Sequence, residues 1–110
     1  MKKKFTLLLL TIIAGIYMAC RQQMEQPSLS NATIARIMAD LHVAEAATTG
    51  LGGYEKDSLT QVYFKQVFEI HGVPKEEYER NIRIIARDEL RLGEVADSAI
   101  ALLKTRSEKR

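Results

Sequence analysis

The sequence predicts an all-α fold, a small bundle of three to four helices, on three observations. Apolar residues recur at three- and four-residue intervals over long stretches, and no two-residue alternation typical of strands persists. Capping residues and glycines separate these stretches. A chain of 110 residues has room for one domain. We expect helices over about residues 30–49, 58–71 and 75–106, in a domain of residues 30–106 with a tail at 107–110.

The first predicted helix has clear signals at both ends. Ser30 can act as its N-cap, and Leu29 and Ile34 then occupy the two positions of a hydrophobic staple. The glycine-rich residues 50–53 disfavour helix and should end it. Its apolar face follows a 4-3-4-3 spacing through Ile34, Met38, Leu41, Glu45 and Thr48. The face is therefore apolar except near its C-terminal end.

The second and third helices are predicted from their start signals. Residues 58–61 (Ser-Leu-Thr-Gln) match a capping box, and Gly72 is typical of a helix end. Pro74 suits the first position of the third helix. One apolar row then runs without a slip through Tyr78, Ile82, Ile85, Glu89, Leu92, Ala96, Ala99 and Leu103. This register predicts one continuous helix, although Asp88 could cap a separate helix and create a break near residue 88.

The first nineteen residues have the composition of a secretory signal. Three lysines precede an apolar run over residues 5–19, which is shorter than the about twenty residues that a membrane span needs. Cys20 follows, and it is either a stray thiol or the acylated residue of a bacterial lipoprotein box. The residues Tyr17-Met18-Ala19-Cys20 resemble that box, with tyrosine in place of the usual leucine. We expect a signal peptide at 1–19, lipid (palmitate) on Cys20 and a polar tether over 20–29.

Cleavage of this signal would change the charge balance of the protein. The full chain has 16 lysines and arginines against 14 acidic residues, and loss of Lys2, Lys3 and Lys4 leaves 13 against 14, a net charge of −1. Such a chain lacks the overall basic character that indicates nucleic-acid binding. A single cysteine also cannot form an internal disulfide, so packing must stabilise the domain.

Three segments of the chain are similar to a family of short bacterial lipoproteins. They are IMADLHVAEAA (residues 37–47), YFKQVFEIHGV (63–73) and KEEY (75–78). The family is catalogued as domain of unknown function 4296 and is found mainly in Bacteroidota. This chain departs from it at Asp88, where proline is frequent, and at Pro74, where Ser or Thr is typical. The resemblance implies an envelope lipoprotein with a small helical domain, and it brings no activity.

Glu45 is the most unusual residue of the first helix, because its position on the helical wheel points it into the apolar face. An unpaired buried carboxylate is costly, so Glu45 would pair with an arginine such as Arg83 or Arg87, or have a raised pKa. His42, three residues earlier, is a neighbour on the wheel, and together with His71 these residues form a candidate binding site. Two histidines are few for a metal bundle, and ion pairing explains Glu45 more simply.

No catalytic set can be assembled from the sequence, so we do not expect an enzyme, a metal or a cofactor. The expected function is a non-catalytic interaction or scaffold module, held by lipid on Cys20 at the periplasmic face of the outer membrane. Its partner would be another protein or a second copy of the chain, bound through helix faces, and no nucleic acid. The alternative is a small-ligand or metal-binding lipoprotein that uses His42 and Glu45.

Overall fold

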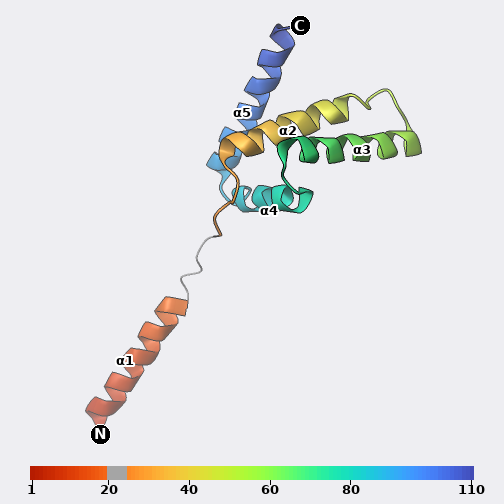
Figure 1. Cartoon of the computed structure of the whole chain (residues 1–110). Coiled ribbons are helices and arrows are strands. Elements are labelled where there is room, and N and C mark those ends of the chain that lie inside the picture. The colour runs from red at the N-terminus through yellow and green to blue at the C-terminus, as the bar shows by residue number, and fades with distance from the viewer. Residues whose placement is uncertain (20–24) are drawn as a thin grey trace.

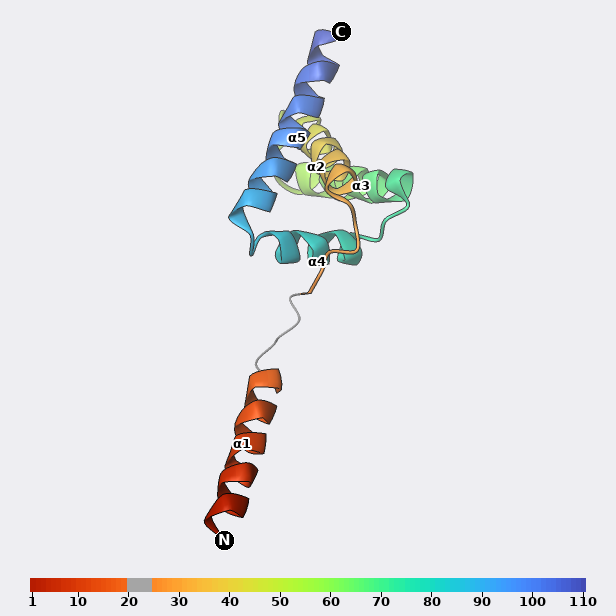
Figure 2. The same ribbon diagram turned by 90° about the vertical axis from the view of Figure 1, so that its left-hand side faces the viewer.

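The computed structural model describes residues 1–19 and 25–110, and Cys20 lies outside these residues. In the described chain every regular element is a helix, which confirms the all-α class. The elements are α1 (Lys2–Ala19), α2 (Asn31–Ala46), α3 (Gly53–His71), α4 (Lys75–Ile85) and α5 (Glu89–Glu108). Figures 1 and 2 both show α1 apart from the domain that α2–α5 form.

The first helix, α1, consists of the predicted signal and adds nothing to the core. Its large apolar side chains are exposed, among them Phe5, Leu7 and Leu10. The buried core residues all lie between residues 34 and 99. Over residues 1–19 and 25–110, no helix has the length and apolar character needed to cross a membrane.

The core of the domain forms around α2, which lies between α3 and α5 (Figure 2). Ile34 and Ile37 of α2 are completely buried. On the side that meets α5, α2 presents Ala32 and Ala35, whose small side chains let α5 approach closely. The other helices contribute Val67 and Phe68 (α3), Tyr78 and Ile85 (α4), and Val95 and Ala99 (α5). Because α2 is covered on two sides, it has more buried residues than α3, α4 or α5.

The start of α3 differs from the prediction. The helix begins at Gly53, and Ser58, expected as its N-cap, lies inside it. Gly53 has a φ of +57°, a conformation that glycine adopts at little cost, so the glycines form the turn between α2 and α3. The hydroxyl of Thr60 contacts that of Thr48 at 3.0 Å and fixes this part of α3 against the end of α2. The capping-box pattern at residues 58–61 therefore gave the wrong helix start.

The continuous helix predicted over 75–106 is broken, and the alternative break near residue 88 is the one found. Asp88 is the N-cap of α5, and its Oδ1 accepts a hydrogen bond from the backbone N–H of Arg91 at 3.3 Å. The break redirects the chain, so that α5 crosses α2 instead of continuing along α4 (Figure 1). Both Ile85, before the break, and Val95, after it, are thereby buried against the common core.

Residues 25–29, which the sequence places in the tether, lie against α4. The buried amide of Asn81 holds them: its Oδ1 accepts from the backbone N–H of Leu29 at 2.9 Å. Its Nδ2 donates to Ser28 Oγ at 2.9 Å and to the backbone oxygen of Glu77 at 2.7 Å. Ser30 then caps α2 as predicted, accepting from the N–H of Thr33. The chain thus enters the domain at a fixed place on α4.

We predict that Asn81→Leu, a change of similar volume, destabilises the protein by about 1–3 kcal/mol, because it leaves the buried N–H of Leu29 without an acceptor. Urea unfolding measures the loss, and hydrogen exchange at the Leu29 amide should become faster. Gln66→Leu, the same change at an exposed position of α3, is the control and should alter the stability by less than about 0.5 kcal/mol. Equal stability of the two variants would contradict the role of Asn81.

Candidate functional site

The structure does not assemble the predicted site of His42, Glu45 and His71. His42 and Glu45 are exposed on α2, and His71 lies half-buried at the end of α3. In the described chain neither the His42 nor the Glu45 side chain makes a hydrogen bond or ion pair. The prediction that Glu45 points into the apolar face is therefore wrong, as is the expected pairing with Arg83 or Arg87.

The position of α5 explains why Glu45 is exposed. α5 crosses the first half of α2, where Arg91 Nε donates to Asn31 Oδ1 at 2.8 Å and Ala35 faces Leu102. Toward its C-terminal end α2 is covered by α3, and the buried positions become Ala44 and Thr48. The buried face thus shifts around the helix, and Glu45 falls outside it.

His71 does contact an acidic residue, but that residue is Asp40. Its Nε2 lies 2.6 Å from Asp40 Oδ2, and Nη1 of Arg106 lies 2.5 Å from Asp40 Oδ1. An ionised carboxylate only accepts hydrogen bonds, so the His71 Nε2–H and Arg106 both donate to it. The three residues come from α3, α2 and α5 respectively. This Asp40 cluster therefore joins the C-terminal ends of α3 and α5 to the middle of α2.

Two opposing effects set the pKa of Asp40. Partial burial of its carboxyl raises the pKa, and the hydrogen bonds from Arg106 and His71 lower it, followed by the attraction of both positive charges. The balance is a pKa below the usual aspartate value, so the carboxylate is ionised at neutral pH. With both oxygens engaged, Asp40 acts as a link between helices.

The chemistry available to the Asp40 cluster is limited. A carboxylate that orients a histidine is one part of a nucleophile-activating site, but such a site also needs a hydroxyl or thiol hydrogen-bonded to the histidine. Within the described residues, the His71 ring is hydrogen-bonded to Asp40 alone. No group of three or more potential metal ligands occurs in that part of the chain either. The geometry fits a structural role.

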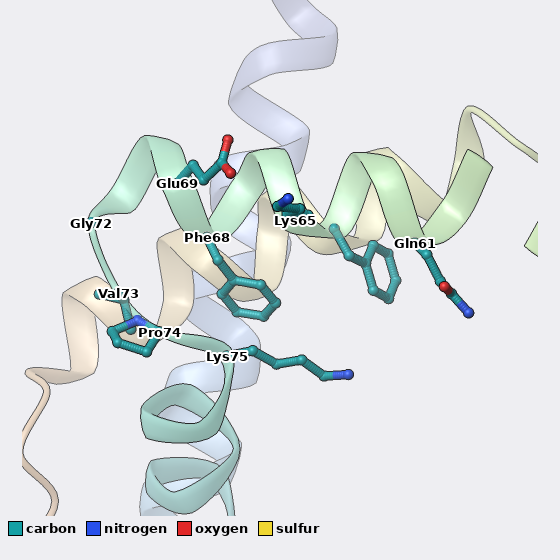
Figure 3. A pocket seen from close by; sticks show the side chains of 9 residues that line it. Gln61, Lys65, Phe68, Glu69, Gly72, Val73, Pro74 and Lys75 are labelled. Atoms are coloured by element: carbon teal, nitrogen blue, oxygen red, sulfur yellow. The ribbon is translucent and has the colours of Figure 1, made fainter. Parts of the chain in front are cut away.

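A groove of about 680 Å³ lies between α3 and the start of α4. Phe64 and Phe68 of α3, with Val73 and Pro74 of the following turn, supply its apolar lining. In Figure 3 Phe68 and Lys75 extend into the same space, and Glu69 points away from it. Lys65 and Lys75 add two positive charges to the rim.

One side chain that lines the groove, Phe68, is part of an aromatic pair. The rings of Phe68 and Tyr78 pack with their centroids 5.6 Å apart and their planes tilted by 52°. Tyr78 is buried, and this burial raises the pKa of its phenol above the usual value. The ring pair connects α3 to α4, and its Phe68 ring also lines the groove.

Comparison with known protein families shows which family the chain belongs to. A family model described as domain of unknown function (DUF4296) matches residues 26–109. The chain belongs to the DUF4296 family. The match begins within the segment that docks on α4, so this segment is part of the DUF4296 domain. Neither the curated proteins nor the solved structures contain a significant match to the chain.

Sequence reasoning missed Asp40, Arg106 and Asn81. The sequence does contain a signal for Asn81, because this residue lies three positions after Tyr78 and four before Ile85, in the buried row of α4. A polar residue in such a row must find buried partners. The sequence contains no such signal for Asp40 and Arg106, since they are 66 positions apart and meet only where α5 crosses α2.

We predict that Asp40→Asn destabilises this DUF4296 protein by about 1 kcal/mol at neutral pH, a modest value because Arg106 is nearly half exposed. The folded-state pKa of Asp40 is lowered, so its stabilising effect is complete above the ordinary value of 3.8 and is lost as the pH falls through the lowered pKa. Urea unfolding at several pH values should show the difference from wild type shrinking in acid. Asp97→Asn, at an exposed site of α5, should show neither effect.

Proposed function

We propose that this chain is a lipid-anchored, non-catalytic interaction module that binds a protein partner in the groove between α3 and α4. The observation that carries the proposal is the groove itself, in which the half-buried Phe64 lies beside two exposed lysines. Exposed concave apolar surface on a small domain is typical of a binding site. The partner would present an apolar segment flanked by acidic residues, which matches both the lining and the charges of Lys65 and Lys75.

The packing of the domain supports the groove as a binding surface. α3 packs along α2 and meets α4 through Phe68 and Tyr78. Phe64, one turn earlier on α3, is only half-buried, although it packs on the core. A partner segment that covers Phe64 would complete burial that the domain itself leaves unfinished, with a gain of about 25 cal/mol per Å² of apolar surface.

The order of sequence features supports the lipid anchor. A basic segment, an apolar run, a small residue and then the single cysteine appear in the order of a bacterial lipoprotein signal. Cleavage before Cys20 would cost the domain none of its core, because α1 contributes no core residue. We further propose, from the sequence alone, the periplasmic face of the outer membrane as the location. The alternative, a ligand or metal site at His42 and Glu45, gains no support from two exposed side chains.

The proposed lipid anchor is tested at Cys20, the residue that would carry the lipid. Wild-type protein expressed in its bacterial host should incorporate labelled palmitate and fractionate with the outer membrane. Cys20→Ala should lose the label completely and leave the outer-membrane fraction. Gln22→Ala, two residues away, is the control and should behave as wild type. Absence of label from wild-type protein would refute the anchor.

The groove is tested by reversing its charge. A photo-cross-linking amino acid in place of Gln61, at the groove edge, should give one discrete protein adduct in intact cells. Lys65→Glu combined with Lys75→Glu should reduce that adduct by about tenfold or more, because two attractive pairs become repulsive. Lys104→Glu with Lys109→Glu, both exposed on the last turns of the chain, should leave it unchanged. Equal adduct yields in both double variants would refute the groove as the binding surface.

A further inference from the structure

The chain that enters the domain is fixed to α4 close to the groove. The Ser28 hydroxyl donates to Glu77 Oε1 at 3.1 Å and accepts from the buried Asn81 amide at 2.9 Å. Asn81 also accepts from the backbone N–H of Leu29. Glu77 lies two residues after Lys75, which borders the groove. The entering segment and the groove therefore share the first turns of one helix.

The entering segment and the groove lie on different sides of α4. Two positions along an α-helix are about 200° apart around its axis, so Lys75 and Glu77 point in nearly opposite directions. None of the described residues 25–29 lines the groove. A partner can therefore fill the groove while the entering segment stays bound to Glu77 and Asn81.

Only a short length of chain separates this fixed point from Cys20. Eight peptide steps lead from Cys20 to Ser28, and even when fully extended they span at most about 29 Å. The further distance across Glu77 to Lys75 brings the reach to about 45 Å at most. A bilayer with its headgroups is about as thick, at about 40–45 Å. A lipid on Cys20 would thus keep the groove within about one bilayer thickness of the membrane surface.

We propose that the groove is filled by a protein held in the same membrane as Cys20, which presents its binding segment close to the membrane surface. This partner would belong to the anchored interaction module proposed above, on which the inference rests. The docking of Ser28 and Leu29 on α4 carries the inference, because it shortens the free chain and so limits how far from the membrane the groove can bind.

The small size of the groove favours a partner in the membrane over a soluble one. Nine residues line the groove, whereas a stable complex between two free proteins uses about 20–30 residues on each side. Two proteins that are held together in one membrane meet at an effective concentration on the order of millimolar. At that concentration even a weak contact is occupied. A soluble partner would have to bind the same nine residues without this advantage.

The test asks whether the cross-linked partner holds the domain to the membrane after the anchor is cut. The full chain carries the photo-cross-linking amino acid at Gln61 and a protease site inserted between Gln22 and Gln23, and it is expressed in its bacterial host. Membranes isolated after illumination are treated with the protease and washed with alkaline carbonate. We expect the free domain to enter the supernatant. The protein adduct should stay in the pellet and band at the density of the membrane that held Cys20.

Two further variants complete the test. The same protease site placed after Arg110 is the control, and cutting there should release neither the free domain nor the adduct. Cys20→Ala should lower the yield of adduct by about tenfold or more, because the groove and its partner are then no longer confined to one membrane.

Three results would overturn the inference. Release of the adduct together with the free domain would show a soluble partner. Recovery of the adduct at the density of the other membrane would place the partner there, and an undiminished adduct in Cys20→Ala would show that confinement contributes nothing. Failure of the proposed function looks different, because the chain with its anchor intact then gives no adduct at all. A failed anchor is seen before cutting, since the domain is then absent from the membrane pellet. Either of these two results would remove the inference as well.

Discussion

Burial of α2 on two sides is the constraint on which the rest of the domain depends. Large side chains such as Ile37 fill the core, whereas Ala32 and Ala35 let α5 lie close. α3 and α5 are positioned mainly by α2, whereas α4 makes smaller contacts with α2 and α5 and packs on α3 through the Phe68–Tyr78 pair. The turn at the glycines and the break at Asp88 both return the chain to α2.

Polar contacts supplement this small core. A domain of this size buries too little apolar surface for large net stability. Asp40 joins three helices through one carboxylate, and Asn81 satisfies three partners from one buried amide. Both act between segments far apart in sequence. They therefore restrict how the helices and the entering chain are arranged, which the non-directional hydrophobic effect does less strictly.

α4 connects the fold to the proposed role. Its first turn, with Lys75, borders the groove, and its buried row packs on the core through Tyr78 and Ile85. Membership of the DUF4296 family establishes the domain, and the groove is the surface on which the proposed function rests.

The sequence by itself determined the helices, because periodicity and caps such as Ser30 and Asp88 are local. It also predicts a secretory signal over residues 1–19. Tertiary structure decided which break was used, where α3 begins, and which side of each helix is buried. A helical wheel gives angles about one axis but not the positions of neighbouring helices. Glu45 is exposed, and Asp40 paired, because the polar contacts of α5 with α2 run from Asn31 to Asp40.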